Sequence, residues 1–399
     1  MTVVNIELPS KSIPPDRFSL FELGFRPFFL LAGLAAILLI AGWVLLLISD
    51  SVLNNYYGLA LWHGHEMVFG FAVAVIAGFL LTAVRNWTNV QTVKGPGLAA
   101  LVLLWLLGRV VAFFPDMLPA WLIALVDLAF LPLLAVALAI PILRSNKKPQ
   151  LAFVVVLLLM FGANFMMHLN LLEITASGNE AGMNLAMNCV LLIIVIMAGR
   201  VVPFFIEKGA PGATPRKWPW LERLALATML LFMLGVLFEV NDNVIALLAA
   251  IAALVHGLRL WGWHSKHLWQ VPLLWVLLLG YAWLVLGFVL TLFVYLGLLT
   301  PMLALHAFAA AIGVLCLGMM SRVALGHTGR LLQPAKVMAW AFALINLAML
   351  LRVSGPLFVP ALEHLAVMGA AILWIAAFAI FIWIYAPILI RARVDGKPG

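Results

Sequence analysis

A short polar motif opens one of the apolar segments of this chain, and its residue types could carry metal chemistry. His63, His65 and Glu66 lie close together there and precede a long run of almost wholly apolar residues. Ionisable groups at the mouth of a membrane helix are costly, so they are functional candidates by default. Imidazole is also a common ligand of haem iron, copper and zinc. His63 and His65 are two positions apart, about 200° around a helix, so one helix could serve two different sites.

Helical spacing also predicts the neighbours of His63 on its own face of the helix. Glu66, Gly70 and Ala74 follow it at intervals of three and four residues, which places them on one side. Small residues on one face indicate either close helix packing or space for a flat cofactor.

The chain has nine histidines, and several lie at the same predicted depth as the motif. Two axial imidazoles from different helices can hold a haem iron between them, so we expect His63 or His65 to pair with His306. Copper prefers imidazoles, sometimes with a thioether. We expect His168 to bind copper, with Asn164 one turn away orienting its ring. The alternative for His168 is a histidine that only hydrogen-bonds a neighbouring helix, and the alternative for His63 and His65 is solvation at the membrane interface.

Two further histidines and four arginines lie near the other ends of the predicted spans. His256 and His327 complete the candidate metal ligands, which are His63, His65, His168, His256, His306 and His327. The arginines could pair with haem propionates; they are Arg26, Arg85, Arg322 and Arg330. Because arginine has no available lone pair near neutral pH, we expect these four to line a basic patch rather than to ligate metal.

The composition identifies the class of protein that must position these residues. Of 399 residues, 66% are hydrophobic and only 10% are charged, whereas a soluble domain carries roughly 25% charged residues. Apolar runs near 20 residues recur, and each can cross a bilayer core of about 30 Å. Backbone in lipid is satisfied only in helices or closed barrels. The sequence therefore predicts an all-α polytopic membrane protein with about twelve transmembrane helices. A recurring pattern of polar residue, small residues and arginine in every fourth span suggests three four-helix units.

The distribution of basic residues predicts the orientation in the membrane. If both termini are cytoplasmic, nearly all Lys and Arg lie inside, and only Arg109 and Arg352 lie towards the outer side. This arrangement accounts for the net charge of +8 without a nucleic-acid partner. We expect cytoplasmic tails at 1–24 and 391–399 and a transmembrane domain at 25–390.

Five motifs give the chain a resemblance to a known family. They are Phe25–Phe29, Trp62–Gly70, Ala77–Thr88, Gly199–Phe205 and Met319–Arg330, and with them the chain resembles the NnrS family over nearly its whole length. The resemblance implies a bacterial inner-membrane protein that carries haem, expected to be b-type, and copper, and that acts in the nitric oxide response. It leaves open whether such a protein reduces nitric oxide, binds it or protects metal centres from it, and it does not identify an electron donor.

Two other functions fit the same residues. Intramembrane His, Glu and Arg side chains also serve as proton or anion sites in secondary transporters. A membrane factor that assists the assembly of metal centres is the other alternative. A haem absorption band in the purified protein would favour the first interpretation over both.

Overall fold

The computed structural model of the protein describes residues 14, 16–49 and 54–397. Within them the fold is all-α, as predicted, and β-structure is limited to one isolated bridge between Phe18 and Arg391. Most of the predicted tail 1–24 lies outside the described residues, as do residues 398–399.

Eleven helices of the described chain are long and apolar enough to cross a membrane, and a shorter apolar helix, α4, brings the number to the predicted twelve. Some crossings are made of two or three consecutive elements. In chain order the helices are α1 (Phe25–Ile48), α2 (Leu59–His65), the π-helix η1 (Glu66–Ala72), α3 (Val73–Thr88), α4 (Pro96–Val111), α5 (Ala120–Leu128), α6 (Phe130–Arg144), α7 (Leu151–Leu171), α8 (Gly178–Gly209), α9 (Pro219–Leu237), α10 (Asp242–Trp263), α11 (Pro272–Tyr295), α12 (Pro301–His327), α13 (Val337–Phe358) and α14 (Glu363–Ile390). Short 3₁₀ turns lie at Lys148–Gln150, Lys266–Gln270 and Pro360–Leu362.

Prolines set several of the helix starts. Helices α4, α9, α11 and α12 begin at Pro96, Pro219, Pro272 and Pro301. Proline fits the first helical position because its fixed φ is already helical and its missing N–H would have had no partner there. These four prolines therefore mark helix boundaries.

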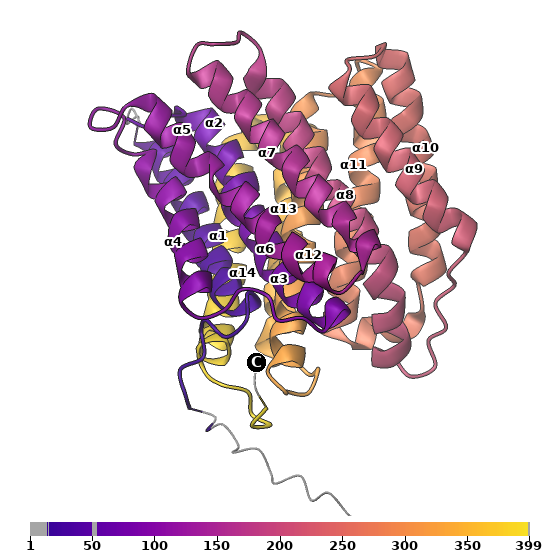
Figure 1. The fold of residues 1–399 in the computed structure, drawn as a ribbon. Coiled ribbons are helices and arrows are strands. Elements are labelled where there is room, and N and C mark those ends of the chain that lie inside the picture. Colours follow the sequence, from indigo (N-terminus) through magenta and orange to yellow (C-terminus); the bar gives the residue numbers. More distant parts are fainter. Residues whose placement is uncertain (1–13, 15, 50–53, 398–399) are drawn as a thin grey trace, which may run out of the picture.

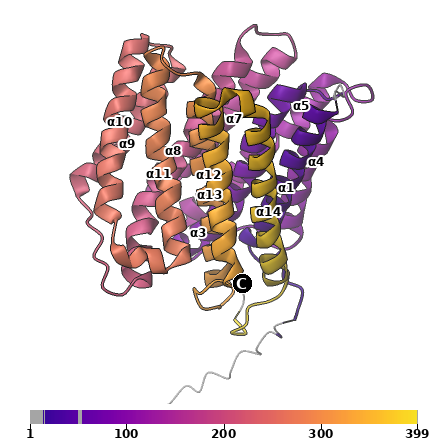
Figure 2. The same cartoon turned by 180° about the vertical axis from the view of Figure 1, so that it is seen from behind.

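The helices form a single bundle in which the first and last helices are neighbours. α1 packs against α14, which brings the two ends of the chain together. Figure 1 shows both described chain ends at the bottom of the bundle and α2 and α5 at the top, and Figure 2 shows α14 beside α1 from behind. We call the bottom the basic end and the top the histidine end, after the residues described below.

The crossing that contains the polar motif lies inside the bundle. In the 18-residue apolar window of the span Leu59–Thr88, 83% is buried within the protein, more than in any other candidate span. This crossing therefore faces protein rather than lipid. Small residues permit this position: a Cβ added at Gly78 would lie 3.0 Å from the side chains of Phe28 and Phe29. The small-residue face of this helix thus serves close packing against α1.

Candidate metal centre

Three buried side chains from three helices meet at the histidine end. His65 comes from α2, Asp127 from α5 and His168 from α7, and all three are almost completely inaccessible to solvent. One ligand atom from each lies within 4.8 Å of the others. Asp127 Oδ2 is 3.3 Å from His65 Nε2 and 3.1 Å from His168 Nε2. Among the described residues this is the one group of three such side chains with the spacing of a metal site.

An asparagine holds two members of this group in place. Asn164 Nδ2 donates to Asp127 Oδ2 at 2.6 Å, and Asn164 Oδ1 lies 3.0 Å from His65 Nε2. The expectation that Asn164 orients the ring of His168 is wrong. That ring contacts Asp127 through Nε2 and the Tyr56 hydroxyl through Nδ1, 3.2 Å away. The amide instead reaches across to α5 and α2, because an acceptor and a donor are available there.

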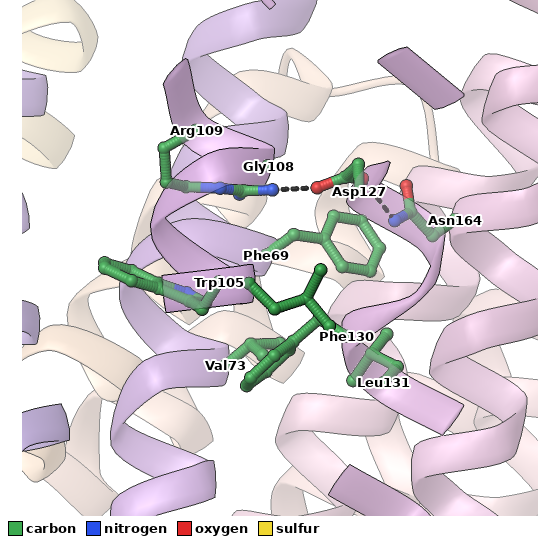
Figure 3. A pocket seen from close by; sticks show the side chains of 10 residues that line it. Phe69, Val73, Trp105, Gly108, Arg109, Asp127, Phe130, Leu131 and Asn164 are labelled. Atoms are coloured by element: carbon green, nitrogen blue, oxygen red, sulfur yellow. Dashed lines mark hydrogen bonds and ion pairs between the residues drawn. The ribbon is translucent and has the colours of Figure 1, made fainter. Parts of the chain in front are cut away.

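Glu66 lies where an α-helix is followed by a π-helix. The α-helix ends at His65 and the π-helix begins at Glu66, and π-helical turns are wider and occur frequently at functional sites. The prediction that Glu66 shares the surroundings of His63 is wrong, because its carboxylate turns towards the adjacent His65 and towards Arg109 on α4. Glu66 Oε1 lies 3.1 Å from His65 Nδ1 and 3.0 Å from Arg109 NH1. Arg109 also pairs with Asp127 (Figure 3).

The charges of this cluster leave room for one more positive charge. Two carboxylates, Glu66 and Asp127, share the single guanidinium of Arg109, so with neutral imidazoles the buried cluster carries one net negative charge. Burying an uncompensated charge is costly. Either a proton on His65, which would let both ring nitrogens donate, or a bound cation restores neutrality. The site is thus electrostatically suited to a metal ion.

Aromatic rings close the site towards the connection between α1 and α2. The Tyr57 ring stacks on His65 with centroids 4.2 Å apart, and Phe69 contacts the same imidazole at 4.7 Å. Burial, with a contribution from the charge of Asp127, raises the pKa of Tyr57 well above its usual value. Its hydroxyl therefore stays protonated at neutral pH.

The open space beside the cluster is small. A cavity of about 10 Å³ lies against Phe69, Trp105, Arg109, Asp127 and Asn164, and Figure 3 shows these side chains around it. This volume holds about one water molecule. A porphyrin does not fit, so the cluster is suited to a single ion with a water-sized ligand.

His63 lies on the other side of the same helix. Its ring packs against Trp43 with centroids 4.5 Å apart, and it is close enough to His306 and Arg352 to interact with their charges. His63 Nδ1 is buried without a hydrogen-bond partner. His306 Nδ1 lies 2.7 Å from the carbonyl oxygen of Met302, a contact in which Nδ1–H donates and Nε2 keeps its lone pair. The structure thus directs His63 and His65 to separate surroundings, as their spacing predicts.

The remaining candidate histidines lie apart from both groups. His256 is fully buried in α10; its Nδ1 is 2.6 Å from the Tyr281 hydroxyl and its ring stacks on Phe288. His327 lies at the basic end near the charges of Arg26 and Arg85. Neither belongs to a group of metal-ligating side chains among the described residues, and the positive surroundings of His327 disfavour a bound cation.

The predicted arginines do not all gather in one patch. Arg26 is buried at the start of α1, where its NH1 donates to the carbonyl oxygens of Leu389 and Arg391 at 3.0 and 2.5 Å. Arg322 instead lies over the ring of Phe205, 3.8 Å from its centroid. Arg85 and Arg330 lie with Arg26 at the basic end.

Asp127 and Arg109 are absent from the sequence-based site, although each carried a signal. Asp127 is the sole ionisable residue of the apolar stretch 119–142. Arg109 and Arg352 are the two arginines that violate the charge asymmetry, and each lies beside one of the two histidine groups. Each arginine on the unfavourable side thus lies near a candidate histidine group.

Substitution of Gly70 by alanine tests the packing around Glu66. A Cβ at this position would lie 2.8 Å from Glu66 Oε2 and 3.5 Å from Arg109 Cδ. Gly70→Ala should displace the carboxylate and lower the free energy of unfolding by about 1–3 kcal/mol, the usual cost of overpacking. Gly162→Ala on α7 is the matched control, because nothing lies within 4 Å of its added Cβ. Thermal unfolding of both variants measures the difference; equal unfolding temperatures would refute this packing.

The comparisons with known proteins give a family for the chain. A search of curated proteins found no match. The model of the NnrS protein family matches residues 19–393, a range that includes every helix and both histidine groups. At the level of the family, a match of this extent identifies a membrane protein linked to the nitric oxide response. The chain therefore belongs to the NnrS family.

Proposed function

We propose that this protein holds copper at His65, Asp127 and His168 and haem between His63 and His306, and that it binds nitric oxide in the bacterial inner membrane. The observation that carries the proposal is that one helix directs two histidines to two separate sets of candidate ligands. Binding of nitric oxide at a metal is the step common to its reduction, its capture and the protection of other metal centres.

The donor set at His65 fits copper. Two imidazole nitrogens and one carboxylate oxygen can converge there, and copper(II) is the divalent first-row ion that such a site binds most tightly. Glu66 contacts Nδ1 of the His65 ring and would orient it with the ion bound at Nε2. Asn164 would then give up its contact with Nε2 to the metal while keeping its hydrogen bond to Asp127. The adjacent cavity leaves space for a small ligand on the metal.

The surroundings of His63 fit a haem iron in three respects. His306 is oriented by its bond to the Met302 carbonyl, which leaves Nε2 available as an axial ligand. His63 has a buried ring nitrogen without a partner. Arg352 supplies a nearby positive charge with which a propionate could pair.

The absorption spectrum and metal content of the purified protein test this proposal. We expect a Soret band and copper in the same preparation. A colourless, metal-free protein that is correctly folded would contradict the proposal, and the buried His–Glu–Arg–Asp network would then support a secondary transporter.

The proposed orientation places both termini in the cytoplasm, because Lys and Arg dominate the connections at the basic end. Reporter fusions near residues 145 and 210 should read cytoplasmic, and a fusion near residue 178 should read periplasmic. The reverse pattern at all three positions would contradict this orientation.

A further inference from the structure

Positive charges from distant parts of the sequence gather at the basic end. Arg26 on α1 lies near the charges of Arg330 and Arg393, and Arg330 lies near Arg391. Arg85, at the end of α3, joins them through the space around His327. We call Arg26, Arg85, Arg330, Arg391 and Arg393 the arginine cluster.

Backbone hydrogen bonds fix the segments that carry these residues. The N–H of Ser19 donates to the carbonyl of Ile390 at 2.8 Å, and the N–H of Ala392 donates to that of Arg17 at 2.9 Å. The N–H of Val394 donates to the carbonyl of Thr328 at 3.1 Å. The two chain ends and the turn after α12 thus form one structure, visible at the bottom of Figure 1, and the cluster is preorganised.

Carboxylates neutralise only part of this charge. Asp395 pairs with Arg393 at 2.6 Å. Arg85, Arg330 and Arg391 have no carboxylate within ion-pair distance in the part of the chain that the structure describes.

Arg330 shows most clearly that the arginine cluster lacks hydrogen-bond acceptors. Its NH1 is buried without a hydrogen-bond partner, and burial, with the nearby charge of Arg391, lowers its pKa. A buried donor left unsatisfied costs about 1–3 kcal/mol. An anion with several acceptor oxygens would remove this cost and the mutual repulsion of the arginines.

Exposed apolar side chains flank the same cluster. Leu331 is 77% exposed, Phe18 is 61% exposed and Val394 is 50% exposed. Leu331 follows Arg330 and Val394 follows Arg393 in the sequence, and Phe18 forms a β-bridge with Arg391. Arginines beside exposed apolar side chains at the end of a transmembrane bundle are typical of contact with lipid headgroups and acyl chains.

We propose that the arginine cluster binds the phosphate headgroup of an anionic phospholipid. The guanidinium groups of Arg85, Arg330 and Arg391, which have no carboxylate partner among the described residues, bind the phosphodiester oxygens. The exposed Phe18, Leu331 and Val394 contact the adjoining acyl chains. A free phosphate ion would satisfy the arginines equally well but would leave these apolar side chains in water, so the lipid is the ligand that fits both observations.

Titration of phosphatidylglycerol and of phosphatidylcholine into the full-length protein in detergent tests this site, with bound lipid measured by native mass spectrometry. We expect phosphatidylglycerol to bind preferentially. Arg330→Gln and Arg85→Gln should each weaken its binding about five-fold, the loss of one lipid-facing arginine. Arg330→Lys should restore most of the affinity, which separates loss of charge from misfolding.

Arg144→Gln is the matched control, since Arg144 is exposed at the end of α6 and is not part of the cluster. It should leave binding unchanged. Equal retention of the two lipids, or equal losses in the Arg144 and Arg330 variants, would overturn the proposal. Displacement of phosphatidylglycerol by an excess of inorganic phosphate would assign the cluster to free phosphate instead.

Discussion

Replacing Asp127 by asparagine should abolish copper binding and strongly destabilise the protein. The carboxylate contacts His65 and His168 and pairs with Arg109, and asparagine keeps its size but not its charge. Removing one partner of a buried ion pair costs about 3–5 kcal/mol. Copper affinity should fall about a hundred-fold or more, since loss of a ligand should cost at least as much as loss of an outer contact.

Asp116→Asn provides the control for this experiment. Asp116 accepts a hydrogen bond from Asn54 at 2.5 Å on an exposed connection at the same end of the bundle. Its replacement should change neither copper content nor unfolding temperature appreciably. Copper per protein by elemental analysis and thermal unfolding report both quantities. Full copper content in the Asp127 variant would exclude the carboxylate as a ligand.

The second large effect is that substitutions of His65 and His63 should each remove a different cofactor. His65→Ala should lose copper and retain haem, whereas His63→Ala should lose haem and retain copper, because the two rings face different partners. His168→Ala should behave like the first variant and His306→Ala like the second. Haem and copper are quantified in the same samples by the pyridine haemochrome spectrum and elemental analysis.

The pairing of outcomes makes this experiment discriminating. General misfolding would lower the content of both haem and copper in every variant. Retention of haem in both the His63 and the His306 variants would refute the axial pair, and loss of haem with full copper in the His168 variant would make His168 an axial ligand instead.

Much of the fold could be predicted because its signals are local. Long apolar runs and terminal prolines such as Pro96 and Pro301 mark the helices directly. The divergence of His63 and His65 follows from two residues of helical spacing. Which helices lie next to one another, and therefore which polar groups meet, does not follow from any local pattern.

The residues of the metal site show what could not be predicted from the sequence. The spacing of an α-helix predicted that Glu66 accompanies His63, but its carboxylate contacts the adjacent His65 and Arg109 on α4. The position of α4 beside this helix does not follow from the residue types of either segment. Asp127 is a single acidic residue in an apolar stretch. Only the packing of its helix in the bundle gives it four partners, which are His65, Arg109, Asn164 and His168.

X-ray absorption spectroscopy of the copper-loaded protein tests the central claim most directly. The site offers imidazole nitrogen and carboxylate oxygen donors, whereas the chain also has 17 methionines whose sulfur could bind copper. We predict copper coordinated by two imidazoles and by oxygen, with this signal lost in Asp127→Asn. A thioether or thiolate ligand in the first coordination sphere would contradict the assignment of copper to His65, Asp127 and His168.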